Sequence, residues 1–402
     1  MTKIGITGMG AVSAGGVGVE ALWQAARDGI SAVSPLSIPR GENLRVRIAA
    51  SVRDFDPREY LSESEIRSCD RFAQFAHVAV AEALQQAKLT DEQLKGPRTA
   101  VIIGTGIGGM TTLDDGCYEV YSGKSRINPL SIPRLIPSSA TSHVSITHKV
   151  TGPCFSVTSA CSSASQSIGI GAQMIRADIV DRAIVGGSEA CITPPGMKAW
   201  EMMRVLSPNY CRPFSKDRNG IIIGEGAGAI ILESEAAMTA RGAKPLAWLS
   251  GYGTSSDAHD IIQPHVEGAV SAMRAALDDA GLNASAIDYI NAHGTGTVLN
   301  DINEAEAIRR VFGDRTDELP VSSIKPVIGH TLGASGALEF IVTVLALLQD
   351  TVPAHINFTG PDPKCPLFLP TDGPLSRPIA AALSNSFAFG GINAALIVTR
   401  AG

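Results

Sequence analysis

The segment FSVTSACSSASQSIG (155–169) places a cysteine between a β-rich run and a train of small residues that predicts a close-packed helix. Unpaired N–H groups and the helix dipole favour negative charge at a helix N-terminus, where a cysteine pKa can fall from about 8.5 to about 3.5–7.5. Cys161 is therefore a candidate nucleophile toward a thioester. The alternative is a small apolar core residue, the commoner role of a buried cysteine.

Two histidines lie in glycine-rich, loop-like segments after predicted strands: His293 in NAHGTGT (291–297) and His330 in SSIKPVIGHTLGASGA (322–337). Lys325 precedes His330 in the second segment. A single loop histidine is more often structural or solvent-exposed. Two histidines and a lysine at strand ends, together with a cysteine at a helix start, favour a functional site over four unrelated structural residues.

Short β-rich runs alternate with helical patterns along the chain, which predicts an α/β architecture of layered sheets and helices. The helix after Cys161 carries no charge before Arg176, so we expect it to be packed on several sides in the interior. The predicted strands are 3–7, 99–104, 155–160, 182–187, 227–234, 245–253, 288–292, 320–324, 380–386 and 395–399. The other predicted helices are 18–29, 72–87, 266–281, 302–313 and 334–350.

The pattern of a β-rich run, small residues and a helix occurs at SVTSACSSASQSIG and again at VSSIKPVIGHTLGASGALE. This similarity predicts a two-fold duplication. We expect an N-terminal half over residues 1–240 that carries Cys161, and a C-terminal half over residues 241–402 that carries both histidines. No segment between them resembles a flexible linker, so the two halves are expected to form one body.

Composition narrows the class of protein. The 402 residues are 45% hydrophobic and 18% charged, which is typical of a globular chain. A net charge of −6 without a basic stripe argues against nucleic-acid binding. The seven cysteines include no Cys-x-x-Cys pair, so we expect neither a disulfide framework nor a zinc site. No signal peptide or membrane-spanning run is recognisable, which predicts a cytoplasmic protein without membrane insertion.

Four ordered motifs carry a family resemblance: SVTSACSSAS, NAHGTGTVLND, SSIKPVIGHTLGASGALE and NSFAFGGINA. With them, the chain resembles the β-ketoacyl-acyl-carrier-protein synthases, condensing enzymes with the thiolase fold, from ITGMGAVS (6–13) to the last predicted strand. His330 within GHTLGASGA is similar to the elongating Cys-His-His group. The resemblance implies an α-β-α-β-α layered body built from the two halves, an acyltransferase activity, a homodimer, and an acyl carrier protein as partner.

The resemblance also implies a reaction, that of type II fatty acid elongation. Cys161 would take the acyl chain from a carrier protein, with the oxyanion held by the backbone N–H groups of Cys161 and Phe389. His293 and His330 would stabilise the enolate formed when malonyl-carrier protein loses CO₂, and the carbanion would attack the acyl thioester to give a 3-oxoacyl chain. We expect no nucleotide, redox cofactor or metal, although family members can hold a monovalent cation near the positions of Asn291, Glu339, Ser384 and Asn385.

Further roles are implied position by position, each with a plainer alternative. Lys325 would set the electrostatics of the site through Glu339, or the pair would only order a loop, and Asp301 would support the geometry. Phe389 resembles a gate that opens when Cys161 is acylated. Thr295 and Thr297 match contacts to the pantetheine arm, or satisfy turn groups. Ile107 matches a residue that lines the acyl pocket. Four basic residues match the regions that dock the carrier protein, or are only solvated surface charges: Arg67, Arg71, Lys124 and Arg126.

The chain departs from the family pattern at several positions. Glycine is usual at Ala388, threonine at Ile392 and Ile262, and aspartate at Ser215 and Asn219. Ala388 could restrict loop opening, because glycine reaches conformations closed to alanine. The departures leave two alternatives open: a specialised ketosynthase of a polyketide, polyene or signal-lipid pathway, and a non-elongating chain-length factor that pairs with an active synthase. Relatives of the second kind lose the cysteine.

Overall fold

A computed structural model describes residues 2–401. Its main sheet has eleven strands and consists of two halves, called here the N-terminal and the C-terminal sheet, which meet at a short antiparallel contact between β1 (Ile4–Ser13) and β9 (Ala247–Ser256). The N-terminal sheet continues from β1 through β8 (Gly226–Ser234), β7 (Arg182–Glu189), β5 (Thr99–Gly104) and β6 (Cys154–Phe155). The C-terminal sheet continues from β9 through β15 (Ile392–Arg400), β14 (Ala381–Ala388), β10 (Tyr289–Asn291) and β11 (Val321–Ser322).

The two sheets match strand for strand in order and direction. In each, the first strand pairs antiparallel with the last strand of its half, the next pairing is also antiparallel, and the two pairings farthest from the β1–β9 contact are parallel. The predicted duplication is therefore confirmed. The short strands outside this path are β2 (Gly16–Val17), paired with β1, and the two-stranded pairs β3 (Ser34–Pro35) with β4 (Ile48–Ala49) and β12 (Thr351–Val352) with β13 (Leu375–Ser376).

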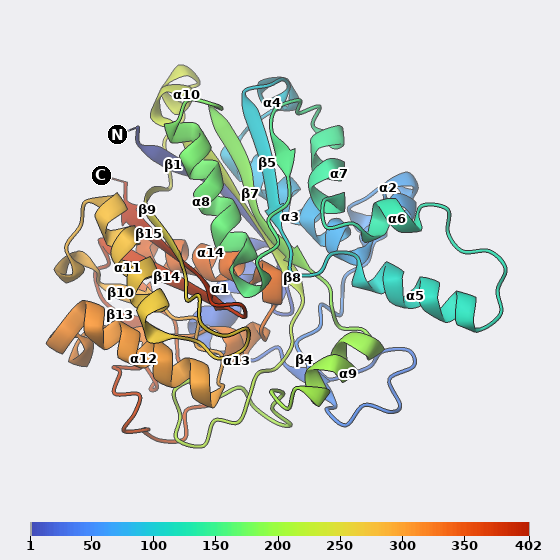
Figure 1. Cartoon of the computed structure of the whole chain (residues 1–402). Coiled ribbons are helices and arrows are strands. Elements are labelled where there is room, and N and C mark those ends of the chain that lie inside the picture. The colour runs from blue at the N-terminus through green and yellow to red at the C-terminus, as the bar shows by residue number, and fades with distance from the viewer. Residues whose placement is uncertain (1, 402) are drawn as a thin grey trace.

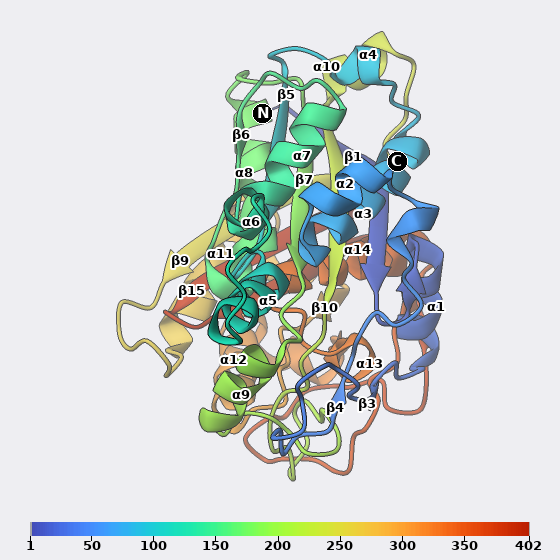
Figure 2. The ribbon, with the colours of Figure 1, turned by 90° about the vertical axis from the view of Figure 1, so that its right-hand side faces the viewer.

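Two helices fill the space between the sheets and contact both of them: α8 (Ser163–Arg176) and α14 (Ser335–Leu348). On the outside, α3 (Arg71–Ala87) packs on β1 and β8, and α11 (Val266–Ala280) packs on β9 and β15 (Figures 1 and 2). These layers form the expected α-β-α-β-α body. The remaining helices are α1 (Val19–Asp28), α2 (Glu63–Ser68), α4 (Asp91–Leu94), α5 (Met110–Tyr121), α6 (Ser131–Leu135), α7 (Ser139–Thr147), α9 (Pro194–Met202), α10 (Glu235–Ala240), α12 (Val298–Phe312) and α13 (Lys325–Ile328).

The two central helices, α8 and α14, are both buried, but their amino-acid compositions differ. α14 is apolar on every face except at Glu339, and all but its last residue are buried. α8 is built from small residues whose burial lets the neighbouring backbones approach closely, as expected from its lack of charge. Each helix follows a 3₁₀ turn, and the turns place Ala160 and Leu332 at the same left-handed φ of 49°. The two halves thus share even this unusual backbone feature.

Two parts of the sequence-based prediction were wrong. The strand predicted at 155–160 ends at Phe155, because the chain then turns toward the left-handed residue Ala160. α12 begins at Val298, four residues before its predicted start, directly after the extended Thr297. Several short outer helices were also missed, since they carry no long apolar period. Within residues 2–401, no helix is long and apolar enough to cross a bilayer.

Close packing of α3 on β1 leads to a prediction about stability. A Cβ at Gly10 would lie 1.9 Å from the backbone oxygen of Ala79 on α3. We expect Gly10→Ala to lower the free energy of unfolding by about 1–3 kcal/mol, measured by urea denaturation, because the helix must move away. Gly116→Ala is the matched control: its Cβ meets no described atom within 4 Å, and helix propensity should raise stability by about 0.5–1 kcal/mol. Equal effects of the two changes would contradict this packing.

Candidate active site

Cys161, His293 and His330 meet where the central helices begin. Cys161 lies in the 3₁₀ turn before α8, and His330 lies just before the equivalent turn of α14. The Nε2 atom of His330 is 3.1 Å from the Sγ atom of Cys161. The ring centroids of the two histidines are 5.3 Å apart, with their planes at 83°. All three side chains are buried, so the three residues selected from the sequence form one site.

Hydrogen bonds fix which nitrogen of each imidazole carries the proton. The backbone N–H of Leu332 donates to Nδ1 of His330 at 3.3 Å, so Nδ1 is an acceptor and Nε2 carries the hydrogen. The Lys325 ammonium group, which can only donate, lies 3.3 Å from Nδ1 of His293. His293 therefore also carries its hydrogen on Nε2. Both rings keep an Nε2–H donor available at a site next to the cysteine.

Lys325 is a buried charge with three partners. Its Nζ atom donates to the carboxylate of Glu339 on α14, to the backbone oxygen of His293 and to the ring of His293. Burial raises the pKa of Glu339 to about 7, against the opposing effect of Lys325. The pairing expected from the sequence is thus present, and Lys325 touches a catalytic histidine directly.

Burial dominates the ionisation of the reacting groups. It raises the pKa of Cys161 to about 12, although Lys325 opposes this. The lowered thiol pKa expected from the helix start is therefore not found in this state of the site. Burial, together with Lys325, holds the pKa of both His293 and His330 well below the usual range. Both imidazoles are neutral near pH 7, which leaves them as N–H donors.

Buried carboxylates that sequence reasoning missed hold the loops of the site. Glu304 on α12 accepts the backbone N–H groups of His293 and Gly294 at 2.8 and 2.7 Å. Glu189, at the end of β7, accepts the N–H of Gly106 at 2.6 Å and that of Gly333 at 3.0 Å. In the sequence, each of these two residues could be noticed only as an acidic residue that lies inside an apolar run or directly follows one.

Asp301, expected to support the geometry, does so through the backbone. Its carboxylate accepts the N–H of Phe214 at 2.8 Å and that of Gly296 at 3.2 Å. The buried guanidinium of Arg218 lies 3.6 Å away. Asp301 therefore ties the loop that carries Thr295 and Thr297 to the 212–220 segment, without contacting a reacting atom.

A cavity of about 300 Å³ leads from the surface to the cysteine. Thr295 and Thr297, whose hydroxyl oxygens are 2.9 Å apart, line it, as expected for pantetheine contacts. Phe389, the expected gate, also lines it and stacks on Trp200 with ring centroids 6.0 Å apart. The other lining residues include three departures from the family pattern, Asn219, Ile262 and Ala388.

Comparison with known proteins agrees with this geometry. Residues 1–237 match the family "Beta-ketoacyl synthase, N-terminal domain", and residues 246–359 match "Beta-ketoacyl synthase, C-terminal domain". The chain belongs to the β-ketoacyl synthase family. The synthase is therefore a condensing enzyme of the acyltransferase type, as its motifs predicted.

Its relatives cover nearly the whole chain. Nodulation protein E of Rhizobium sp. (strain N33) is 40% identical over 395 residues, 98% of each chain. The 3-oxoacyl-[acyl-carrier-protein] synthase 2 of Staphylococcus aureus (strain COL) is 38% identical over 406 residues, 99% of this chain and 98% of the relative. The ishigamide ketosynthase/chain length factor structure is 33% identical, with a TM-score of 0.96 and 100% of both chains covered.

The residues that the sequence assigned to carrier docking and to the acyl pocket differ in exposure and in their ion-pair partners. Arg71 is partly exposed, and its guanidinium pairs with the buried Glu225 at 2.8 Å, so its expected role in carrier docking stays a prediction. Arg67, Lys124 and Arg126 are exposed, the first two in surface ion pairs with acidic neighbours on their own segments. Ile107 is 44% exposed and does not line the cavity within this chain, so its place in an acyl pocket stays a prediction.

Four buried side-chain oxygen atoms lack a hydrogen-bond partner among residues 2–401. They belong to Asn291, Glu339, Ser384 and Asn385. Asn291 and Ser384 are register partners on neighbouring strands. Carboxylate, amide and hydroxyl oxygens are the donors that a hard cation prefers. Oxygen donors of this kind would suit the monovalent cation that the family resemblance associates with these positions, and our expectation of no metal stays untested.

The buried pair of Lys325 and Glu339 leads to a prediction. Glu339→Gln leaves the ammonium group without its counter-charge, so we expect the free energy of unfolding to fall by about 3–5 kcal/mol in urea denaturation. The double variant Lys325→Met/Glu339→Leu should recover most of the loss, because no unpaired charge remains. Glu63→Gln is the control, since Glu63 pairs with Arg67 while 87% exposed, and it should leave stability unchanged. A loss in Glu339→Gln no larger than in Glu63→Gln would contradict the prediction.

Proposed function

We propose that the synthase elongates an acyl chain by decarboxylating condensation with malonyl-acyl-carrier protein, as in type II fatty acid synthesis. The observation that carries this proposal is the convergence of two neutral imidazole Nε2–H donors beside one buried thiol. Two such donors suit an oxyanion that forms next to the thioester of the nucleophile. A single donor with a general base would suit simple hydrolysis instead.

The first half-reaction loads the cysteine. The sulfur of Cys161 attacks the acyl thioester, the thiol proton leaves with the pantetheine sulfur, and a new thioester forms. Formation of the thiolate must overcome burial, and the Nε2–H of His330 at 3.1 Å together with the N-terminus of α8 provides donors that favour it. The backbone N–H groups of Cys161 and Phe389 are proposed to hold the oxyanion.

The second half-reaction uses both histidines. When the malonyl group loses CO₂, the electron pair of the broken C–C bond moves to the thioester oxygen, which accepts the Nε2–H groups of His293 and His330. The carbanion then attacks the acyl thioester, and Cys161 leaves as thiolate and regains a proton. Lys325 keeps His293 neutral and correctly oriented. A bound monovalent cation at the four buried oxygens without a partner among residues 2–401 would add positive charge behind these residues.

Mass spectrometry of the intact protein tests the nucleophile. After incubation with acyl-carrier proteins, we expect the wild type to gain the mass of one acyl group and Cys161→Ala to gain none. Cys117→Ala, which removes an exposed thiol on α5, should load like the wild type. Cys161→Ala should also retain its melting temperature, because only a sulfur atom is removed. An acyl adduct on Cys161→Ala, or full condensing activity of that variant, would overturn the proposal.

A specialised ketosynthase remains a second candidate, favoured by two observations. The Rhizobium nodulation proteins and the ishigamide ketosynthase are among its relatives, and Ala388 and Ile262 change the lining of the cavity. The same loading assay distinguishes the candidates: saturated chains of graded length load on a general synthase, whereas preference for polyunsaturated or polyketide chains indicates the specialised one. A chain-length factor is disfavoured, since Cys161 and both histidines are present in contact geometry.

An acyl carrier protein is the proposed partner at the mouth of the cavity. In one similar structure, 29% identical with a TM-score of 0.91, an acyl carrier protein of a type II polyketide synthase is in complex with its ketosynthase. Arg204 lines the cavity of this chain, is exposed, and has no ion-pair partner within residues 2–401. An unpaired guanidinium group at the mouth of the cavity would attract an acidic carrier protein.

Charge reversal at this rim should weaken carrier binding. We expect Arg204→Glu to raise the KM for acyl-carrier protein about tenfold at low salt and less at high salt, because rim charges mainly govern association. Arg58→Glu is the control: Arg58 is also exposed but pairs with Asp56 outside the cavity. Turnover of a small pantetheine thioester should not change in either variant. The same KM in both variants would show that Arg204 does not contribute to carrier docking.

We further propose a homodimer in which a second copy covers the free edge at β6. Strand β6 ends the N-terminal sheet, and both of its residues are exposed. The 107–155 segment, which ends in β6, exposes several large apolar side chains: Ile107, Leu113, Tyr118, Ile127, Ile132, Ile146 and Phe155. An apolar face of this kind next to an open sheet edge is typical of an interface. Sedimentation velocity measures the oligomeric state, and a monomer at micromolar concentration would refute it.

A further inference from the structure

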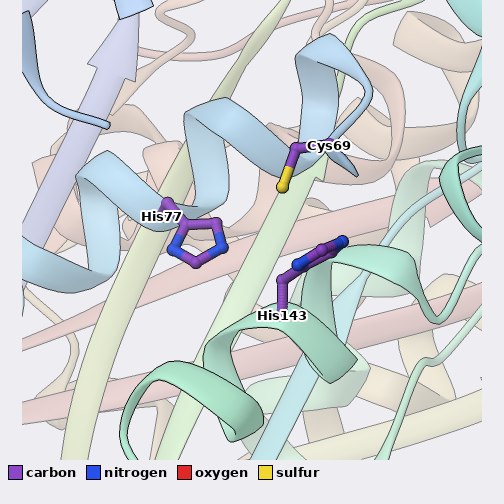
Figure 3. A group of neighbouring side chains, drawn as sticks. All are labelled: Cys69, His77 and His143. Carbon is purple, nitrogen blue, oxygen red and sulfur yellow. The ribbon is translucent and has the colours of Figure 1, made fainter. Parts of the chain in front are cut away.

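Three potential metal ligands meet on the outer side of the N-terminal half, on elements that do not carry the reacting residues (Figure 3). Cys69 follows the last residue of α2, His77 lies on α3, and His143 lies on α7. Their ligating atoms lie within 4.8 Å of one another. The sulfur of Cys69 and both imidazole rings face a common space between α3 and α7 (Figure 3).

The ring of His77 is an unsatisfied buried group. Its Nε2 atom is buried and has no hydrogen-bond partner among residues 2–401, and the residue is only 6% exposed. Buried polar atoms in folded proteins almost always have a partner, because an unsatisfied one costs free energy. A ligand in the space next to His77 would remove this deficit.

His143 is already oriented for coordination. Its Nε2 atom lies 3.2 Å from the carbonyl oxygen of Ser68, which can only accept. Nε2 therefore carries the hydrogen, and Nδ1 keeps a free lone pair. Metal-binding histidines commonly donate their second ring N–H to a backbone carbonyl in this way. Because Ser68 precedes Cys69, the same bond holds the ring beside the thiol.

The surrounding charges suit a cation. Burial lowers the pKa of His77 to about 4, so its ring is neutral near pH 7. The half-buried carboxylate of Glu65 acts on both imidazoles. Burial raises the pKa of Cys69 to about 11, while Arg134 favours its thiolate. A metal must therefore displace the thiol proton as it binds.

We propose that Cys69, His77 and His143 bind one Zn²⁺, with water in the fourth position. One thiolate and two imidazoles form a set that suits zinc. Bond lengths of about 2.3 Å to sulfur and 2.0–2.1 Å to nitrogen require the ligand atoms to draw together to about 3.4–3.6 Å. Binding exchanges the proton of the Cys69 thiol for the Zn–S bond and releases it to solvent. The ion links α2, α3 and α7 on the outside of the N-terminal sheet.

Metal titration of the full chain tests this site. The experiment uses the Cys161→Ala background, because Cys161, His293 and His330 also lie within metal-binding distance of one another. We expect one equivalent of Co²⁺ to give thiolate charge-transfer absorption and tetrahedral d–d bands, and one equivalent of Zn²⁺ to displace it. Adding Cys69→Ser should abolish the charge-transfer band and weaken binding at least 100-fold. Adding His143→Gln should weaken it at least tenfold.

His148→Gln is the matched control. His148 directly follows α7 and has similar burial, but its ring bonds to Asp91 outside the cluster, so binding should not change. Circular dichroism of the metal-free variants establishes that each is folded, and His143→Gln decides the question if Cys69→Ser does not fold. The absence of saturable binding, or binding that folded His143→Gln leaves unchanged, overturns the proposal. Acyl loading of Cys69→Ser with Cys161 intact should match the wild type, which separates this site from catalysis.

Discussion

The close approach of α8 and α14 between the sheets is the constraint on which the rest of the structure depends. A Cβ at Gly336 would lie 2.2 Å from the hydroxyl oxygen of Ser165, and one at Gly104 would lie 2.5 Å from the backbone of Ser163. Only glycine at these points lets each helix pack this closely on its neighbours. Because the helices begin at the same level, their approach brings Cys161 and His330 into contact. The same 3₁₀ turn with a left-handed residue precedes each helix, so both halves place a functional residue at a helix start in the same way.

Around that contact, the protein keeps several charges out of water. Glu189, Glu304 and Asp301 each accept two or more hydrogen bonds from loop backbone. A buried carboxylate is stable only when such donors replace its hydration. The result is a set of loops held by ionic hydrogen bonds, which fixes the imidazole donors before substrate arrives. Fixed donors in a dry site stabilise an enolate more than mobile ones, because they need no reorganisation during the reaction.

The sequence was sufficient for the layered architecture, the duplication and the three residues that meet in the candidate site, since small-residue runs and glycine-rich histidine loops leave strong local patterns. It was insufficient wherever a side chain's role depends on distant partners. The ion pair of Arg71 with Glu225, far along the chain, could not be predicted from its neighbours in the sequence. Cys69, His77 and His143 come from three different helical segments, so no Cys-x-x-Cys spacing could reveal them. The thiol pKa of Cys161 depends on burial, which local sequence does not encode.

The gate shows how departures from the family pattern act together. Ala388 is the last residue of β14 and pairs with Ile392 in an extended conformation that any residue adopts. The left-handed backbone is supplied instead by Gly390 and Gly391, with φ of 81° and 67°. The N–H of Gly390 also donates to the carbonyl of Ile261, next to Ile262 at the cavity. Phe389, the expected gate, thus directly precedes a glycine turn that this contact ties to the 257–265 loop. Ala388 flanks this turn on one side and the 257–265 loop contacts it on the other, so both departures lie next to the expected gate.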